Sequence, residues 1–218
     1  MRLYFDLTPN TEPVPFDYQH FLIGALHKWL GLNKIHDDVS LYSLSWLFEG
    51  KIENDNLDFP NGSKWFISFF DIESAKLVLK NVLTEPEVCC GMKVKEVKIQ
   101  DTPQFGTAYR FMVASPVLIR KYDGVGLKHL LYDNPETDAL LTQTLKTKLG
   151  KAGMIADRVQ VRFDRTYTKA RTKLVTIKGI QNRASLCPII VEGNQEVVSF
   201  AWDVGVGHST GSGFGALC

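Results

Sequence analysis

The chain has 218 residues, a formal net charge of +1, 44% apolar residues and 22% charged residues. These values are ordinary for a globular protein in water, and they allow one large domain or two small ones. We expect no transmembrane helix, because no run of about 18 apolar residues occurs. The first residues also lack the pattern of a signal peptide. Net charge alone does not indicate a nucleic-acid partner.

The four cysteines suggest neither a metal site nor a disulfide framework. They are Cys89, Cys90, Cys187 and Cys218, and none belongs to a Cys-x-x-Cys pair. Two adjacent cysteines are poorly spaced for zinc ligation and for bonding to each other. We therefore expect reduced thiols in a cytoplasmic protein that uses no metal and no cofactor.

The first hundred residues predict the order strand, helix, strand, strand, helix, strand. The first strand and the last strand show alternating apolar and polar residues, and Pro15 and Asp17 open the first helix. The expected elements are a strand over 1–7, a helix from 17 to about 31, strands over 41–48 and 65–70, a helix over 72–83 capped by Asp71, and a strand over 92–99.

The second half of the chain predicts the same order again. A strand over 109–121 is interrupted by Pro116, and Asn134-Pro135 opens a helix that ends near Gly150. Further expected elements are strands over 159–168 and 174–178, an extension of that sheet over 188–191, a helix over 195–204 and a strand over 214–218. The sequence therefore predicts an α+β fold of two tandem ferredoxin-like units with a C-terminal glycine-rich loop. We expect domains at 1–104 and 105–218, divided within the polar segment 101–107.

Residues 205–215 form the glycine-rich loop, with five glycines in eleven positions. It is not a phosphate loop of a nucleotide-binding enzyme, because it lacks Gly-Lys-Ser/Thr and lies before a strand rather than before a helix. A helix end followed by a turn would need about two glycines. We therefore favour contact with a ligand, and the candidate contacts are Gly207, His208, Ser209, Gly211, Gly213 and Phe214.

The segment from Arg162 to Arg183 contains seven basic residues and one acidic residue, Asp164. It therefore carries a charge of +6 in a chain of +1, and it includes two aromatic residues. We interpret it as a hairpin that binds phosphates and stacks on bases, although a solvated basic hairpin is the alternative. The candidate RNA-binding residues are Arg162, Arg165, Lys169, Arg171 and Lys173.

Histidines supply the candidates for acid–base chemistry, since their unperturbed pKa lies near neutrality. On the first helix, His20, Gly24, His27 and Gly31 share one narrow stripe, opposite an apolar face that includes Phe21. His36 lies in the loop after this helix and is the leading catalytic candidate. His208 in the glycine-rich loop is its competitor, and simple solvent exposure is the alternative for the two histidines of the stripe.

Several segments, taken in order, resemble a known family. They are Val14–Phe16, His36 followed by Tyr42-Ser43-Leu44, the Ser115-Pro116-Val117 opening of the second half, and the glycine-rich loop. Together they make the chain similar to the CRISPR-associated endoribonuclease six group of the RAMP superfamily. The resemblance extends over essentially the whole chain.

The resemblance implies that CRISPR repeat RNA crosses a cleft between two ferredoxin-like folds. It also implies metal-independent cleavage by the 2′-hydroxyl of the RNA, which leaves a 2′,3′-cyclic phosphate and a 5′-hydroxyl. His36 and His27 match two catalytic positions of the family. The family's lysine has no clean match; Lys51 is the candidate that we assign to it, and a hydroxyl group of Ser43 or Ser45 is the alternative. Subunits of a CRISPR effector complex and a second copy of the chain are further candidate partners, and a membrane is not.

Two other functions compete with the nuclease. A non-catalytic RNA-binding RAMP subunit of an effector complex would share the fold, the glycine-rich loop and the basic segment. A ferredoxin-like regulatory domain for small ligands is more distant, because the basic segment argues against it.

Overall fold

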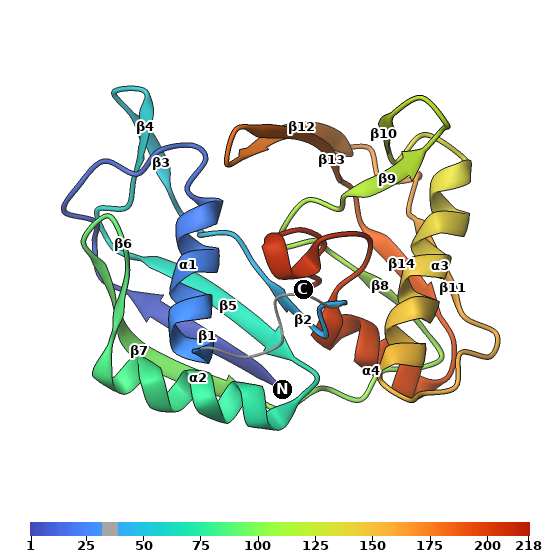
Figure 1. Cartoon of the computed structure of the whole chain (residues 1–218), viewed down its shortest axis with the longest axis horizontal. Helices are drawn as coiled ribbons and strands as arrows, with labels where there is room; N and C mark the ends of the chain where they lie inside the picture. The colour runs from blue at the N-terminus through green and yellow to red at the C-terminus, as the bar shows by residue number, and fades with distance from the viewer. Residues whose placement is uncertain (32–38) are drawn as a thin grey trace.

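The computed structural model of the chain describes residues 1–31 and 39–218 (Figure 1). It confirms the expected α+β class. The described helices are α1 (Gln19–Leu30), α2 (Ile72–Thr84), α3 (Glu136–Lys151) and α4 (Gln195–Val204), together with a short 3-10 helix, η2 (Thr210–Ser212). In the described part of the chain, no helix has the length and apolar character needed to cross a membrane.

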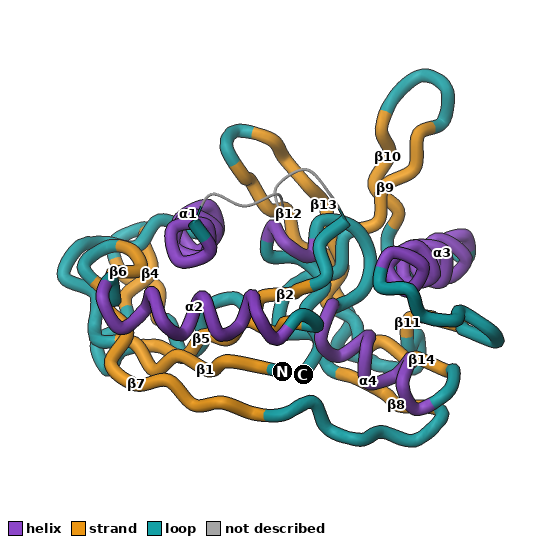
Figure 2. The backbone as a smooth tube through the Cα atoms, turned by 60° about the horizontal axis from the view of Figure 1, so that its bottom comes forward, coloured by secondary structure: helices purple, strands orange, loops and turns teal. Residues whose placement is uncertain are grey.

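The first half of the chain is built on one antiparallel sheet. Its strands are β1 (Arg2–Leu7), β2 (Tyr42–Leu44), β5 (Ser63–Phe69), β6 (Glu87–Cys89) and β7 (Met92–Gln100), in the spatial order β2-β5-β1-β7-β6. Helices α1 and α2 lie together on one face of this sheet (Figure 2). A separate hairpin of β3 (Lys51–Glu53) and β4 (Asn56–Asp58) projects beyond the end at which α1 begins (Figure 1).

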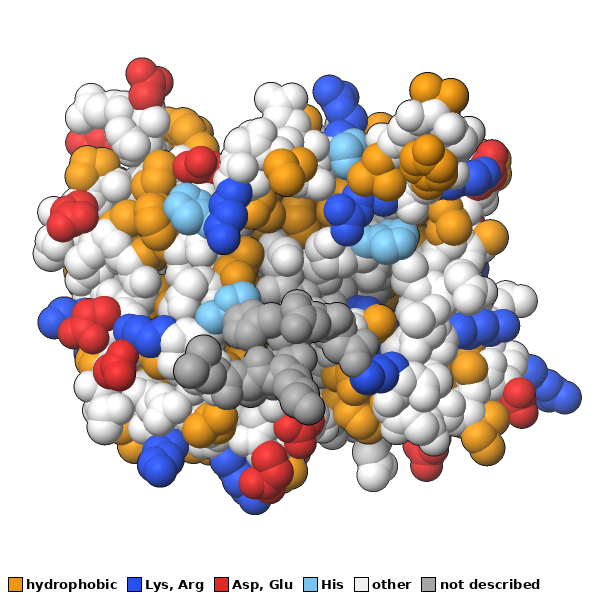
Figure 3. Space-filling model, viewed as in Figure 1, with side chains coloured by type: hydrophobic (Ala, Val, Ile, Leu, Met, Phe, Trp, Pro, Cys, Tyr) orange, Lys and Arg blue, Asp and Glu red, His pale blue; other side chains and the backbone are white. Residues whose placement is uncertain are grey.

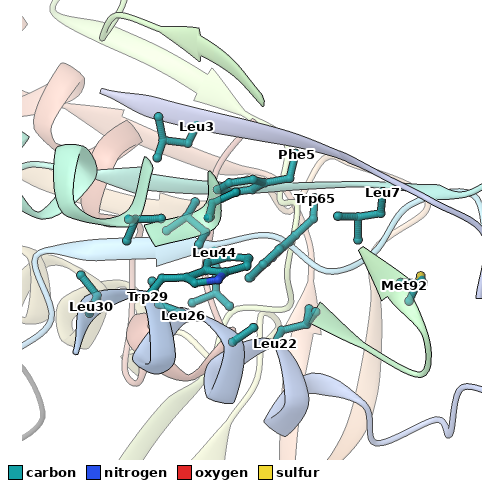
Figure 4. Packing of buried hydrophobic residues seen from close by; sticks show 14 of the residues in the cluster. Leu3, Phe5, Leu7, Leu22, Leu26, Trp29, Leu30, Leu44, Trp65 and Met92 are labelled. Carbon is teal, nitrogen blue, oxygen red and sulfur yellow. The ribbon is translucent and has the colours of Figure 1, made fainter. Parts of the chain in front are cut away.

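Aromatic rings fill the space between this sheet and α1. The alternation along β1 points Leu3, Phe5 and Leu7 into the core. The ring of Trp29 on α1 lies 5.5 Å from that of Phe5 and 5.8 Å from that of Trp65 (Figure 4). These contacts hold α1 against the sheet and so fix the direction of its polar stripe.

The second half contains a three-stranded antiparallel sheet. Its strands are β8 (Ala108–Phe111), β11 (Gln160–Phe163) and β14 (Ile189–Glu192), in the order β11-β14-β8. The C-terminal residues run beside the segment that follows β8, where backbone hydrogen bonds join Met112 to Cys218 and Ala114 to Ala216. Apolar residues of α3 and α4 and of the sheet strands form one buried core.

Two hairpins project from the second half on the same side of the molecule (Figure 2). One consists of β9 (Ile119–Tyr122) and β10 (Leu127–Leu130), and the other of β12 (Arg171–Ile177) and β13 (Ile180–Leu186). The β12–β13 hairpin reaches from the second half toward the first (Figure 1).

Arg2 joins the two halves of the chain. Its Nη2 donates hydrogen bonds to the carbonyl oxygens of Trp202 (3.1 Å) and Leu217 (2.7 Å), and its Nε donates to Ser68 Oγ (2.5 Å). The guanidinium lies between the rings of Phe66 and Trp202, with its carbon 3.9 and 3.6 Å from their centroids. Because the side chain is buried, these contacts compensate a desolvated charge. Burial also lowers the pKa of this arginine.

The expected helices and most expected strands are present, and Asp71 caps α2 as predicted by accepting from the backbone nitrogens of Glu73 and Ser74. The strand expected over 159–168 is wrong beyond Phe163. Asp164 forms a turn there, since its Oδ1 accepts from the backbone nitrogen of Thr166 (3.1 Å).

The sheet pairing of the second half also differs from the expectation. Segment 188–191 does not extend the sheet of β12; it belongs to β14, which pairs with β11 and β8. The partner of β12 is β13, a strand that we did not predict. Among the shorter elements, the strand expected over 41–48 is limited to β2, the one over 109–121 divides into β8 and β9, and the one over 214–218 is reduced to a bridge between Val113 and Leu217.

Candidate nucleic-acid interface

The catalytic candidates are only partly covered by the structure. His36 lies outside the described residues. His27 lies half-buried in the last turn of α1. Lys51 is exposed on β3, beyond the other end of α1. The structure therefore does not bring Lys51 and His27 together, because the β3–β4 hairpin extends away from the end of the helix that carries the histidine.

The polar stripe of α1 is oriented as the sequence indicated. His20 and His27 are half-buried and Gly24 is exposed, and a Cβ atom at Gly24 would meet nothing within 4 Å. His20 Nδ1 lies 2.7 Å from the carbonyl oxygen of Asp17. Phe21 was expected in the core, but it is 39% exposed and packs against the His20 ring instead.

The five basic candidates do not share one hairpin, which corrects the sequence-based interpretation. Arg162 lies on β11 and donates to Glu192 Oε1 at 2.9 Å. Arg165 follows β11 and donates to both carboxylate oxygens of Asp138, at 2.5 and 3.1 Å. Both arginines therefore have carboxylate partners away from β12, because the residues between Phe163 and Arg171 form turns that separate β11 from that strand.

Arg171 and Lys173 do lie on β12, and Lys169 lies two residues before it, all three exposed. Arg171 and Lys173 are two residues apart on a strand and so lie on the same face. Lys173 Nζ is 4.8 Å from the centroid of the Trp46 ring. Partial desolvation lowers the pKa of Lys173, and the charge of Arg171 lowers it to a smaller extent.

Arg171 and Lys173 border a groove between the two halves, which we call the hairpin groove. It has a volume of about 300 Å³. The first half contributes Trp46 and Phe48, and the second half contributes Pro116, Arg171, Lys173 and Leu186. Aromatic rings and cations along one groove can bind bases by stacking and phosphates by charge. Figure 3 shows basic and histidine side chains on the face over which the hairpins project.

The glycine-rich loop is packed more tightly than the ligand-contacting interpretation predicted. Gly215 has a φ of +63°, and a Cβ atom there would lie 1.9 Å from the carbonyl oxygen of Val206. Gly207, Gly211 and Gly213 are also buried, and Phe214 is 2% exposed beneath Leu118 and Val175. Phe214 therefore cannot stack on a base, and the glycines serve first to let the loop fold onto itself.

His208 and Ser209 remain accessible and face a second hollow, which we call the central cavity. Its volume is about 430 Å³, and its other polar lining includes Ser40, Thr144, Thr147 and Lys148. The backbone nitrogen of Arg120 donates to His208 Nδ1 at 3.2 Å. Burial lowers the pKa of His208, and the charges of Arg120 and Lys148 lower it further.

Lys148 is a buried cation that we did not predict. Its Nζ donates to the carbonyl oxygen of Val204 and to Thr210 Oγ1, both at 2.8 Å. Burial lowers the pKa of Lys148 to about 7. Lys148 lies three residues after Leu145, on the apolar face of α3. A lysine on an apolar helix face is the feature by which it could have been identified from the sequence. Trp46 and Arg120 carried no comparable signal.

The second half of the chain matches a known family. Residues 97–218 match the family described as CRISPR associated protein Cas6, C-terminal. The match covers more than half of the sequence, and the chain belongs to the Cas6 family. A search of curated proteins finds no significant match.

Solved structures share the fold over the full length of the chain. The protein encoded by a Cas6-related gene from Pyrococcus furiosus is 19% identical with a TM-score of 0.86, covering 100% of this chain and 97% of the other. A RAMP protein described as binding different RNA substrates is 21% identical with a TM-score of 0.83, covering 100% and 98%. A further CRISPR associated protein Cas6 is 21% identical with a TM-score of 0.82, covering 100% and 98%.

Proposed function

We propose that this chain is a metal-independent endoribonuclease that cleaves CRISPR repeat RNA. The observation that carries the RNA-binding part of the proposal is the hairpin groove, which is lined by Trp46 of the first half and by Lys173 and Arg171 of the second, with Lys173 over the indole ring. A strand of RNA in this groove would lie across the junction of the halves. Membership of the Cas6 family and the RNA-binding description of one similar structure support the choice of RNA.

The proposal includes the architecture expected from the sequence. We infer two ferredoxin-like units at 1–104 and 105–218. In support, the first sheet has the order β2-β5-β1-β7, and the second has β11-β14-β8 followed by the C-terminal segment. Both orders are those of a β-α-β-β-α-β unit in which the first and third strands are central.

The proposed reaction needs two proton transfers and no water. The 2′-hydroxyl loses a proton and its oxygen attacks the adjacent phosphorus, the bond to the 5′-oxygen breaks, and that oxygen receives a proton. The products are a 2′,3′-cyclic phosphate and a 5′-hydroxyl. We propose His36 and His27 for the transfers, since histidine can act as base or acid near neutral pH. We do not extend this role to Lys51, which lies beyond the other end of α1.

A non-catalytic RNA-binding RAMP subunit is the second candidate. The separation of Lys51 from His27 favours it, because a nuclease of this kind benefits from a cation near the reacting phosphate. The hairpin groove is equally compatible with both functions.

One experiment separates the two candidates. The protein is incubated in EDTA with its cognate repeat RNA and with the same RNA carrying a 2′-deoxy nucleotide before the cut. The nuclease proposal predicts one cut in the first RNA, no cut in the second, and similar affinity for both, since the phosphates are retained. Binding without any cut supports the subunit, and a cut that requires added Mg²⁺ contradicts the metal-independent mechanism.

A further inference from the structure

Arg120 occupies the place where the β9–β10 hairpin meets the glycine-rich loop. Its backbone nitrogen donates to His208 Nδ1 at 3.2 Å, and its Nη2 donates to Ser209 Oγ at 2.7 Å. His129 on β10 is its cross-strand partner. A histidine whose Nδ1 accepts a hydrogen bond carries its proton on Nε2, so His208 offers a donor from that atom.

Positive charge accumulates around Arg120, and no carboxylate of the described residues pairs with it. Arg183 lies on β13, which packs against β10, and its charge together with that of Arg120 reinforces the effect of burial in lowering the pKa of His129. Among residues 1–31 and 39–218, neither Arg120 nor Arg183 has a carboxylate oxygen within 4 Å, whereas Arg110, Arg162 and Arg165 each have one. Clustered cations of this kind are stabilised when an anion binds.

The same place has unused hydrogen-bonding capacity. Arg120 donates from Nη2, and its Nε and Nη1 have no hydrogen-bond partner within the described part of the chain. His129 Nε2 is buried and lacks a partner among those residues. The fork of a guanidinium matches two oxygens of one phosphate.

The cluster adjoins a space that can hold such a group. His208 and Ser209 line the central cavity of about 430 Å³, and the described lining adds the hydroxyl group of Ser40 but no carboxylate. The hydroxyl groups of Thr144 and Thr147 also line it, but they donate to backbone carbonyl oxygens of their own helix. Phosphate oxygens accept hydrogen bonds from hydroxyl, imidazole and guanidinium groups alike. The described lining therefore suits an anion and contributes no carboxylate that would repel one.

We propose that Arg120, His208 and Ser209 form a subsite for one phosphodiester group of the RNA at the mouth of the central cavity, with Arg183 adding positive charge and His129 Nε2 adding a further hydrogen-bonding atom. The proposal rests on the RNA-binding function proposed above and goes further by assigning a second contact region. Trp46 lines the hairpin groove and donates to Gly213 of the glycine-rich loop, so RNA that contacts both the groove and this subsite would pass over that loop.

The first test measures affinity for the cognate repeat RNA as a function of salt. We expect Arg120→Gln to lower affinity by roughly 10- to 100-fold at low salt. It should also flatten the slope of log affinity against log salt by about 0.7, the value for one contact on single-stranded RNA. The matched control is Arg158→Gln, an exposed arginine on the loop between α3 and β11, which should change neither quantity.

The second test locates the phosphate. RNAs that each carry one neutral methylphosphonate linkage are bound to the wild type and to Arg120→Gln. At one linkage the methylphosphonate should lower the affinity of the wild type but should not lower the affinity of Arg120→Gln any further. Such non-additivity is the signature of a direct pair in a double-mutant cycle. A merely structural role of Arg120 would give losses that add at every linkage.

The outcomes are distinct. If the wild type does not bind the repeat RNA, the proposed function fails. If it binds and Arg120→Gln retains both its affinity and its salt slope, the subsite is wrong. If Arg120→Gln is unfolded by circular dichroism, Arg183→Gln decides by the same two criteria, because that side chain is exposed.

Discussion

The indole nitrogen of Trp46 donates a hydrogen bond of 2.8 Å to the carbonyl oxygen of Gly213. This bond joins the segment that follows β2 in the first half to the glycine-rich loop in the second. Because Lys173 lies over the same indole ring, the geometry of the loop and that of the hairpin groove depend on one side chain.

Trp46 therefore offers a test of coupling between stability and RNA binding. Trp46→Phe retains a ring but removes the donor, and we expect the free energy of unfolding to fall by about 1 kcal/mol. Trp46→Ala should lower it further and should weaken RNA binding more than Trp46→Phe does, since the stacking surface is lost. Urea denaturation and RNA titration measure both effects. Equal RNA affinities of the two variants would exclude stacking on this ring.

The burial of Lys148 makes the free energy of unfolding depend on pH above neutrality. Its pKa is about 7 in the folded protein, below the ordinary 10.5. Between these values the unfolded chain binds more protons at this residue, so the free energy of unfolding rises with pH, by at most about 1.4 kcal/mol per unit. Below pH 7 Lys148 is protonated in both the folded and the unfolded state, so it adds no pH dependence to the free energy of unfolding there. Lys148→Met should remove the rise.

The measurement for Lys148 is the difference in urea stability between the wild type and Lys148→Met at pH 7 and at pH 9. Taking the difference cancels the titration of groups common to both proteins. The free energy of unfolding of the wild type should rise relative to that of Lys148→Met between pH 7 and pH 9. A difference that stays constant would mean that Lys148 keeps an ordinary pKa despite its burial.

His36 remains the leading catalytic prediction. We expect His36→Ala to bind repeat RNA with nearly wild-type affinity and to cleave it roughly 10² to 10⁴ times more slowly, the usual range for a general acid or base. Single-turnover rates at saturating protein separate chemistry from binding. His208→Ala should reduce this rate less, and the reverse order would show that His208 is the catalytic histidine.

The basic segment divides into two groups with different expected roles. Lys173→Ala should weaken RNA binding and flatten the salt slope by about 0.7. Arg165→Ala should leave that slope unchanged and lower stability instead, because Arg165 is paired with Asp138 and also donates to the carbonyl oxygen of Tyr132. Thermal melting and salt-dependent binding of both variants test this division. Equal salt slopes in the two variants would show that the division is wrong.

The sequence alone determined the helices and the class of fold. Helix periodicity and capping are local properties, so the polar stripe of α1 and the Asp71 cap followed from residues a few positions apart. The resemblance in sequence also indicated the Cas6 family, which the family match confirms.

The tertiary structure decided which residues share a surface. Strand pairing depends on contacts between residues far apart in the chain, so the pairing of β12 with β13 and the separate ion pairs of Arg162 and Arg165 could not be read from spacing. The same holds for Phe214, whose burial depends on β12, β13 and Leu118. Arg120 and His129 lie on one hairpin and His208 lies in the glycine-rich loop, and only the packing of the hairpin against the loop brings the three residues to one place.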